Sequence, residues 1–253
     1  MSSESGLLRD KRVVVLGASR GVGRAIVQCA SSEGAQVLAV ARQASGLTEL
    51  AKETSGVDTL ALDAASEAAP GEVLRRAKPD VLVICGGAIP PVRPVYQLGW
   101  AEFSINWEVD TKMAFLFCRE ALRAPLAPGS VVVIISSGAG LGGSAISGGY
   151  AGAKRMQMFI AKYCHAESDR LELGIRFVTL VHSRVMPGTE LGQAAVNGYA
   201  QYLGVSPEKF IENMGPRQSP TDVANAVLDI AKKPPAEPGS IFTISAEGVA
   251  AAS

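Results

Sequence analysis

A tyrosine and a lysine lie four residues apart in a segment with helical periodicity, Tyr150-Ala151-Gly152-Ala153-Lys154. Positions i and i+4 share one face of a helix, so both side chains can act on one ligand. A phenol exchanges protons poorly near pH 7, but a neighbouring ammonium favours the phenolate and lowers the phenol pKa. The pair predicts a general acid or base, Tyr150, assisted by Lys154. The same spacing is also that of an ordinary exposed helical pair.

The segment upstream favours the catalytic interpretation. Ile135-Ser136-Ser137-Gly138 closes a β-branched run thirteen residues before Tyr150. Ligands of an open parallel sheet bind outside the carboxyl ends of its strands, where the Ser137 hydroxyl can meet a carbonyl oxygen. We therefore expect Ser137, Tyr150 and Lys154 to form one catalytic group.

Short β-branched runs alternate with longer segments of helical period. This alternation predicts an α/β fold, a Rossmann-like, doubly wound parallel sheet of about seven strands with helices on both faces. The predicted strands are Arg12–Leu16, Gln36–Val40, Thr59–Leu62, Val81–Ile84, Ser130–Ile135, Ile175–Val181 and Ser240–Ile244. The predicted helices are Val22–Ser32, Leu47–Thr54, Gly71–Ala77, Trp100–Ala124, Tyr150–Ser168, a mixed region from Glu190 to Met214, and Thr221–Lys232.

A glycine-rich segment joins the first predicted strand to the first predicted helix. Glycines at this position let the chain turn sharply and let a pyrophosphate approach the amides of the helix start. The spacing is G-x-x-x-G-x-G rather than G-x-G-x-x-G, and glycines also serve tight turns. The position between strand and helix favours a dinucleotide site. The expected cofactor-binding residues here are Gly17, Ser19, Arg20, Gly21, Val22 and Gly23.

The residues after the second predicted strand indicate which dinucleotide binds. A site specific for NAD places a carboxylate about twenty residues beyond the loop, on the adenosine ribose. This chain has Ala41-Arg42 there instead. Arg42, with Arg20 of the loop, can bind a 2′-phosphate, so the expected cofactor is NADP(H). Alternatively, both arginines are simply surface cations.

Other strand ends carry further candidates for the same crevice. Asp63 follows the third predicted strand, where it can accept a hydrogen bond from the adenine amino group or cap the next turn. Cys85, Gly86 and Gly87 follow the fourth. Because strand ends of a parallel sheet meet at one edge, we expect all these residues in one crevice.

Composition limits the other partners. Lys plus Arg and Asp plus Glu number 24 each, so no large field of one sign attracts nucleic acid or an anionic membrane. A small-molecule partner is favoured. The four cysteines form no C-x-x-C pair, which suits a reducing cytoplasm. The polar start lacks the apolar core of a signal peptide, and we expect a soluble, unprocessed cytoplasmic protein without a metal site. With 253 residues and no visible linker, residues 1–253 are expected to be one domain.

These motifs, in this order, make the sequence resemble the short-chain dehydrogenase/reductase family, in its single-domain branch, over nearly the whole chain. Gly17, Gly21 and Gly23 match the family's cofactor loop, although Leu16 stands where threonine is usual. Gly87 is the one identity with the family's Asn-Asn-Ala-Gly segment.

The active-site serine, tyrosine and lysine of the family fall on Ser137, Tyr150 and Lys154. The resemblance implies reduction of a ketone by NADPH, or oxidation of the alcohol in reverse. In that reaction, the resemblance implies that Ser137 binds the carbonyl oxygen and Tyr150 donates the proton. It implies that Lys154 binds the nicotinamide ribose and lowers the tyrosine pKa. It also implies a homodimer or homotetramer built on the helices around residues 100–124 and 150–168.

Two positions depart from the family pattern. Asp110 stands where the family carries an asparagine that holds a water of its proton relay, with Asn106 one turn earlier as an alternative. As a carboxylate, Asp110 can hold a water but donates no hydrogen bond, and its charge favours protonated Lys154 and Tyr150. His182-Ser183 replaces the family's Pro-Gly beside the nicotinamide. His182 is expected to contact ligand or to be satisfied by backbone groups, and Thr189 to touch the cofactor.

The substrate side is predicted to be apolar. The longest irregular stretch runs from His182 to about Pro220, and residues 186–219 are expected to form a substrate lid. An apolar carbonyl or alcohol substrate would contact residues after Gly87, the turn beyond Ser137 and this lid. The apolar candidates are Ala88 to Val92, Tyr199, Tyr202, Phe210 and Met214.

Three other functions fit parts of this pattern. An extended-family epimerase or dehydratase would use the same tyrosine and lysine but would carry G-x-x-G-x-x-G and a larger C-terminal domain. A redox-neutral isomerase or dehydratase of a natural-product pathway needs no net cofactor consumption. A non-enzymatic NADP(H)-sensing protein would bind without turnover.

Overall fold

The computed structural model describes residues 8–215, 218–232, 241–245 and 248–251. Most of the polar start, Ser240 of the last predicted strand and residues 216–217 of the predicted lid lie outside the described residues.

A single sheet forms the centre of the fold. Its strand order is β3-β2-β1-β4-β5-β6-β7-β8, with β8 antiparallel to β7 and all other neighbours parallel. This is the Rossmann-like, doubly wound arrangement that the alternating pattern predicts. The strands are β1 (Arg12–Leu16), β2 (Gln36–Ala41), β3 (Val57–Ala61), β4 (Val81–Ile84), β5 (Val131–Ser137), β6 (Arg176–His182), β7 (Ile241–Ser245) and β8 (Gly248–Ala251).

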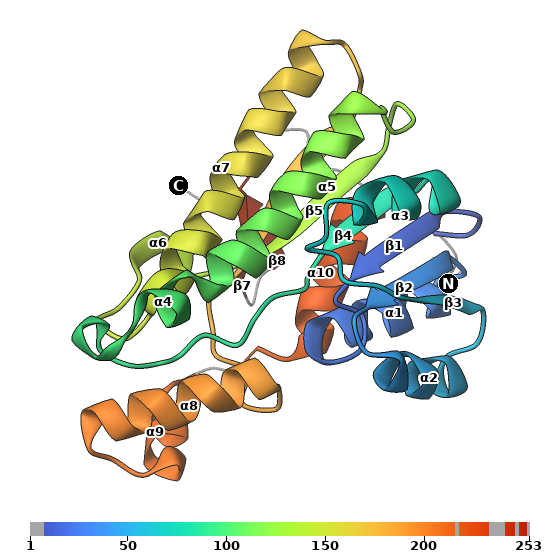
Figure 1. The fold of residues 1–253 in the computed structure, drawn as a ribbon. Helices are drawn as coiled ribbons and strands as arrows, with labels where there is room; N and C mark the ends of the chain where they lie inside the picture. The colour runs from blue at the N-terminus through green and yellow to red at the C-terminus, as the bar shows by residue number, and fades with distance from the viewer. Residues whose placement is uncertain (1–7, 216–217, 233–240, 246–247, 252–253) are drawn as a thin grey trace.

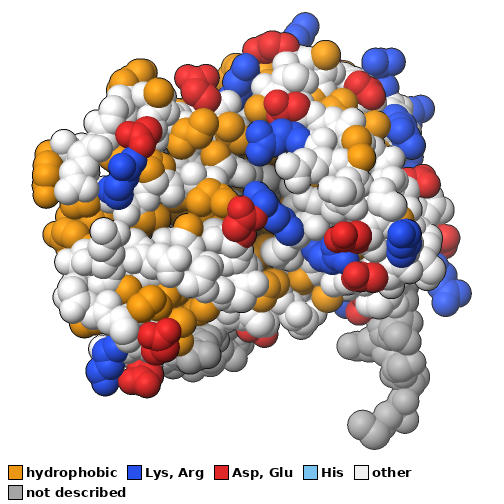
Figure 2. Space-filling view, turned by 60° about the horizontal axis from the view of Figure 1, so that its bottom comes forward, with side chains coloured by type: hydrophobic (Ala, Val, Ile, Leu, Met, Phe, Trp, Pro, Cys, Tyr) orange, Lys and Arg blue, Asp and Glu red, His pale blue; other side chains and the backbone are white. Residues whose placement is uncertain are grey.

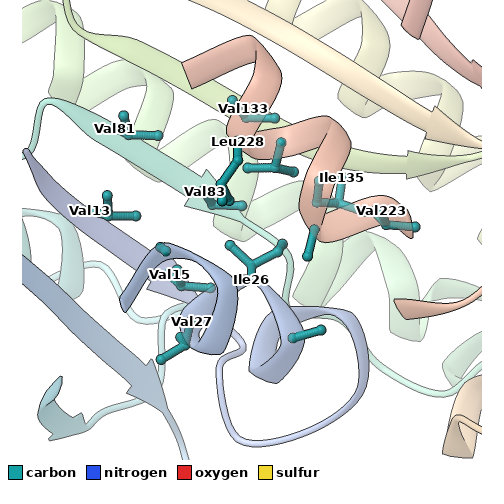
Figure 3. Close-up of a cluster of buried hydrophobic side chains, with 14 of the residues drawn as sticks. Val13, Val15, Ile26, Val27, Val81, Val83, Val133, Ile135, Val223 and Leu228 are labelled. Carbon is teal, nitrogen blue, oxygen red and sulfur yellow. The ribbon is translucent and has the colours of Figure 1, made fainter. Parts of the chain in front are cut away.

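Helices cover both faces of the sheet (Figure 1). One buried cluster joins one face to α1, α2 and α10, and Figure 3 shows Ile26 and Leu228 meeting the strand valines there. A second cluster joins the other face to α3, α5 and α7. The helices are α1 (Gly21–Ser32), α2 (Ala44–Glu53), α3 (Ala69–Ala77), α4 (Trp100–Asn106), α5 (Lys112–Arg123), α6 (Ala139–Gly142), α7 (Gly148–Arg170), α8 (Glu190–Leu203), α9 (Pro207–Asn213) and α10 (Pro220–Lys232), with a 3₁₀ turn at Val95–Gln97.

The helical stretch predicted over residues 100–124 is present, but it is not one regular α-helix. A π-helical turn, Trp107–Thr111, interrupts it between α4 and α5. A single π-helical turn inside a helix is too short to give a hydrophobic period of its own, so the pattern does not reveal it.

The stretch after residue 182, predicted as the longest irregular one, contains α8 and α9. These helices confirm the mixed helical region predicted from Glu190 to Met214, and they lie outside the two helical layers (Figure 1). Thr189 and Ser206 begin these helices, each accepting a hydrogen bond from a first-turn amide through its hydroxyl.

Three smaller differences are local. β3 begins at Val57, two residues before the predicted strand, because it pairs with β2 from Val37 onward. β8 and the short α6 were not predicted, because Gly248–Ala251 and Ala139–Gly142 carry small residues without a β-branched or amphipathic pattern.

No helix among the described residues combines the length and apolar character needed to cross a bilayer. Within the same residues, His, Cys, Asp and Glu side chains form no cluster of three that could hold a metal ion.

Candidate active site

A cleft of about 230 Å³ opens at the carboxyl ends of β1 and β4, where the strand order reverses. The surface is hollowed near the centre of the view in Figure 2. The structure brings together in this cleft the residues that the sequence predicted for the cofactor. They are Gly17, Ser19, Arg20, Gly21, Val22, Gly23, Arg42, Asp63, Cys85, Gly86, Gly87, Tyr150, Lys154, His182 and Thr189, and Asp110 joins them.

The glycine loop is shaped by contacts that exclude larger residues. Gly17 has a φ of +82°, and a Cβ there would lie 2.4 Å from the Gly86 Cα. A Cβ on Gly23 would lie 2.2 Å from the Gly17 oxygen. The loop therefore packs backbone against backbone before α1 begins. α1 has no side-chain cap and no acidic residue in its first turn, so its amides remain suited to an anion.

Charged and polar side chains line the outer part of the cleft. Arg42 is exposed there, while Arg20 forms an ion pair with Glu190 of α8 across the opening. Asp63 accepts a hydrogen bond from the Ala65 amide at 3.0 Å, which is the turn-capping alternative. Thr189 places its methyl group against Gly21, while its hydroxyl donates to Met186 and accepts from Gly192.

Tyr150, Lys154 and Asp110 form a buried group at the inner end of the cleft. The Lys154 Nζ lies 3.2 Å from the Asp110 Oδ2, and their side chains are 8% and 1% exposed. The same Nζ lies 5.5 Å from the centroid of the Tyr150 ring and 3.4 Å from the Ile135 carbonyl oxygen. Ser137 lies close enough to the Tyr150 phenol to act on its pKa. The Tyr150 phenol, the Lys154 ammonium and the Asp110 carboxylate therefore lie next to one another in this order.

Asp110, rather than Asn106, is the residue beside Lys154. Its Oδ1 accepts hydrogen bonds from the Ala88 amide at 2.9 Å and from Asn106 at 3.3 Å. Asn106 also donates to the Ala88 carbonyl at 2.8 Å. A Cβ on Gly87 would lie 2.7 Å from the Asp110 Oδ2, so the carboxylate fills the space that glycine leaves.

Two glycines of α7 and the π turn bring Asp110 to this position. A Cβ on Gly149 would lie 1.9 Å from the Phe103 oxygen, and one on Gly152 would lie 3.1 Å from the Trp107 ring. The Trp107 indole donates to the Gly149 carbonyl at 3.1 Å. Close approach of the two segments is therefore possible because glycines flank Tyr150.

The π turn leaves a backbone group that α7 satisfies. Gln157, which is fully buried, donates from its Nε2 to the Asp110 carbonyl oxygen at 3.1 Å. This contact ties the turn to α7 one helical turn beyond Lys154.

Burial and the neighbouring charges set the protonation of the group. Burial raises the pKa of the Tyr150 phenol, and although Lys154 and Ser137 act against this, the net shift is upward. The sequence predicted the effect of the lysine but not that burial outweighs it. Burial alone would lower the pKa of Lys154, but Asp110 and Tyr150 reverse this and raise it. Burial raises the pKa of the Cys85 thiol to about 12. All three groups are therefore protonated near neutral pH.

A second cavity of about 400 Å³ lies on the other side of Tyr150. Ser137 lines it, and Tyr150, His182, Met186, Thr189 and Leu191 line both hollows. Its remaining wall includes the predicted Pro90, Val92, Tyr199 and Phe210. Tyr202 and Met214, which were also predicted, do not line it.

His182 is the last residue of β6 rather than part of the following loop. In the sheet it is paired with Ser137 of β5, and the Gly138 amide donates to its carbonyl at 2.8 Å. Its ring Nδ1 lies 3.2 Å from the Arg184 carbonyl oxygen. Burial lowers the pKa of His182 to about 4.

Sequence reasoning missed three residues. Glu190 pairs with Arg20, Gln157 holds the Asp110 backbone, and Gln218 accepts from the amides of residues 183 and 184. Each contact joins segments far apart in the chain, and glutamate and glutamine on helices carry no pattern that marks them.

The sheet order and the cleft at its switch point define a protein of the doubly wound α/β class. A profile of the short-chain dehydrogenase family matches residues 11–189. The chain belongs to this family.

The relatives are reductases that match over part of the chain. L-xylulose reductase of Bos taurus is 28% identical over 129 residues, which are 51% of this chain and 53% of that protein. D-erythrulose reductase of Gallus gallus is 29% identical over 132 residues, which are 51% of this chain and 53% of that protein. The chain therefore spans about half the length of the curated relatives it matches.

Solved structures match the whole fold at lower identity. Levodione reductase has a TM-score of 0.81 with 21% identity, covering 94% of this chain and 97% of that chain. The 3-ketoacyl-(acyl-carrier-protein) reductase of Brucella melitensis, complexed with NADH, has a TM-score of 0.73 with 21% identity, covering 88% of this chain and 91% of that chain. At this identity the likeness shows the fold.

Proposed function

We propose that this protein is an NADP(H)-dependent oxidoreductase that reduces a ketone or oxidises the corresponding secondary alcohol. The observation that carries the proposal is the position of Tyr150, which lines both a polar cleft and an apolar cavity, beside Lys154 and with Ser137 in the cavity wall. A reductase of this kind needs a binding site for the cofactor, a binding site for the ketone, and a proton donor between the two sites.

The cleft fits a dinucleotide. Backbone contacts at Gly17 and Gly23 keep the loop narrow, and α1 leaves its first-turn amides uncapped for a pyrophosphate. Arg42 and Arg20 supply positive charge, and Ala41 occupies the place of the carboxylate of an NAD site. These features support NADP(H) over NAD(H). Asp63 would contact the adenine, and Cys85, Gly86, Gly87, His182 and Thr189 the remaining cofactor.

The chain's own residues perform the proton transfer. Ser137 and Tyr150 hold the carbonyl oxygen by hydrogen bonds, and Tyr150 gives its proton to that oxygen. NADPH, when bound, would supply the hydride for the carbonyl carbon. Lys154 stabilises the developing phenolate and would bind the ribose hydroxyls of the cofactor.

Asp110 is a positioning residue in this scheme. Its carboxylate holds the Lys154 ammonium at 3.2 Å and favours the protonated lysine. Lysine then remains charged although it is buried, which stabilises the phenolate that forms when Tyr150 gives up its proton.

The apolar cavity favours a substrate with an apolar part. We assign α8 and α9, which lie within the predicted lid region 186–219 and contribute to the cavity wall, as its lid. The relatives are named for two ketoses, L-xylulose and D-erythrulose, so a small carbonyl compound is the substrate class. We further propose a homodimer or homotetramer, because exposed Phe115 and Tyr163 lie on α5 and α7. The four free cysteines support a location in the reducing cytoplasm.

The test is NADPH oxidation with a panel of ketones, followed by absorbance of the reduced nicotinamide. The variant Tyr150→Phe should lower kcat by about a hundredfold or more, since it removes the proton donor. Tyr96→Phe changes an exposed tyrosine outside both hollows and should retain the activity. Full turnover by Tyr150→Phe excludes the mechanism.

The same assay separates the alternatives. Tight NADPH binding without turnover of any ketone would indicate a sensor, and product formation without net NADPH consumption would indicate an isomerase or dehydratase. Tighter binding of NADH than of NADPH in a titration would exclude the proposal that Arg20 and Arg42 bind the 2′-phosphate.

A further inference from the structure

His182 and Ser137 lie next to each other in the wall of the apolar cavity. The two residues are paired between the parallel strands β5 and β6. Paired residues of neighbouring strands point to the same face of a sheet, with strands about 4.8 Å apart. Both side chains line the cavity that also contains Tyr150. A ligand oxygen held by Ser137 therefore lies within reach of the His182 ring.

The His182 ring has a defined tautomer. Its Nδ1 faces the Arg184 carbonyl oxygen at 3.2 Å, and since a carbonyl only accepts, Nδ1 carries the proton. Burial and the nearby Lys154 charge lower the pKa of His182 to about 4, so the ring is neutral near pH 7. In a neutral ring the other nitrogen, Nε2, is then an acceptor.

The backbone around this ring is fixed. The Gln218 Oε1 accepts from the amides of Ser183 and Arg184 at 3.2 and 3.3 Å. The Gln218 Nε2 donates to the Ile244 carbonyl at 3.0 Å. The Arg184 carbonyl is held in place, and the Nε2 of His182 is left without a hydrogen bond from any described residue.

Two other hydroxyls of the cavity wall, those of Ser147 and Tyr199, are already paired. Ser144 forms hydrogen bonds with Ser147 at 2.9 Å and with Tyr199 at 2.7 Å. The rest of the wall is largely apolar, with Ile146 and Phe210 among its residues. The free acceptor thus shares the cavity wall with the proposed proton donors, and no hydrogen bond from a described residue, including the neighbouring Ser183 and Arg184, occupies it.

We propose that the His182 Nε2 accepts a hydrogen bond from a hydroxyl on the carbon next to the reacting carbonyl, so that the substrate is an α-hydroxy ketone with an apolar remainder. The inference rests on the proposed function. In the reaction, the carbonyl carbon gains a hydride from NADPH and its oxygen gains the Tyr150 proton. The neighbouring hydroxyl is unchanged, and the product is a vicinal diol with NADP⁺.

The acceptor also excludes other ketones. A plain ketone leaves the Nε2 desolvated and unpaired, which disfavours binding. A second carbonyl or a carboxylate next to the reacting carbon brings another acceptor against Nε2 and is disfavoured further.

Three matched probes test the proposal: α-hydroxyacetophenone, acetophenone and α-methoxyacetophenone. The methoxy compound keeps the electron-withdrawing oxygen but lacks the hydrogen-bond donor. We expect kcat/KM for the hydroxy ketone to exceed the other two by about 10- to 100-fold in the wild-type protein, the value of one buried hydrogen bond. Equal kcat/KM for hydroxy and methoxy ketones overturns the proposal without any variant.

Variants of the two histidines assign the effect. His182→Leu should reduce the hydroxy-to-methoxy ratio to near one, while His182→Gln, whose side-chain oxygen can accept, should restore part of it. His165→Leu makes the same change on α7 outside the cavity and should keep the wild-type ratio. A wild-type ratio in His182→Leu overturns the assignment. If the three ketones are reduced without selectivity, this inference alone is refuted. If no ketone of the wider panel supports NADPH oxidation, the proposed function is refuted too.

Discussion

The Asp110 carboxylate pairs directly with the Lys154 ammonium, with Oδ2 and Nζ 3.2 Å apart in a buried site. The protonation of Lys154 depends on this carboxylate. Burial alone lowers the pKa of Lys154, whereas Asp110 contributes to the net upward shift. The same carboxylate acts with burial to raise the pKa of Tyr150. Removal of this one charge should therefore change how the whole group titrates.

Asp110→Asn should move the alkaline limit of ketone reduction to lower pH. The substitution removes a negative charge that favours the protonated forms of Tyr150 and Lys154, and lowers the pKa of both. Reduction needs the phenol and the ammonium, so loss of either proton ends it. The measurement is kcat/KM against pH. Glu108→Gln makes the same change on an exposed side chain of the π turn and should leave the profile in place. An identical profile for Asp110→Asn would refute the coupling.

The pair should also show a large coupling energy in stability. Asp110→Asn leaves the buried Lys154 ammonium without its partner, and Lys154→Met leaves the buried Asp110 carboxylate without its partner. Each single variant should lower the free energy of unfolding by about 3–5 kcal/mol. The double variant should lose less than the sum by about 2 kcal/mol, because it leaves neither charge unpaired. Urea unfolding of the four proteins at pH 7 measures this. Additive losses would mean that the two groups contribute separately.

The sequence predicts the parts of the site that depend on local spacing. Tyr150 and Lys154 share a helix face, and the glycine loop lies between a strand and a helix, so neighbours in the chain suffice to locate them. The sheet follows from the buried β-branched runs. β8 cannot be predicted in this way, because its residues are small and it joins the sheet only by pairing with β7.

The remaining parts depend on contacts between distant segments. The position of Asp110 requires the π turn and the close approach of Gly149 to Phe103, neither of which the helical period specifies. The tautomer of His182 depends on the path of the following loop, which Gln218 holds from beyond α9. Residue types and spacing give candidates for such contacts, but only packing selects among them.

Gly149→Ala should disrupt the site through packing. The added Cβ would lie 1.9 Å from the Phe103 oxygen, so α4 or α7 must move, at a cost of about 1–3 kcal/mol or more in unfolding free energy. Ketone reduction should fall with it, because the displacement separates Asp110 from Lys154. Gly71→Ala is the control on another helix, where a Cβ meets nothing within 4 Å. It should raise the unfolding free energy by about 0.5–1 kcal/mol. Equal stability of the two variants would contradict the close contact.

Glu190→Gln should strengthen the binding of NADPH more than that of NADH. Glu190 holds Arg20 in an ion pair at the cleft, and without its charge the guanidinium is available to a 2′-phosphate. Fluorescence titration with both dinucleotides at constant ionic strength gives the two Kd values. Glu212→Gln removes the partner of Lys209 on α9 and should change neither value. If Glu190→Gln shifts both Kd values equally, Arg20 does not bind the 2′-phosphate.

His182 should make the folded protein less stable as the pH falls from about 6.5 to 4. Burial, with the nearby Lys154 ammonium, lowers the pKa of the folded His182 to about 4, while an unfolded histidine titrates near 6.5. In this range the unfolded chain binds a proton that the folded chain excludes, so acid favours unfolding, on the order of 1–3 kcal/mol in full. Below about pH 4 both states bind it and the loss ends. The measurement is urea unfolding at pH 7 and pH 4.5. His182→Leu should lose less stability between these two pH values than the wild type, whereas His165→Leu should not reproduce that reduction. Equal losses in the wild type and His182→Leu would show that the His182 ring is not kept neutral by its site, and would remove the acceptor on which the hydroxy-ketone preference depends.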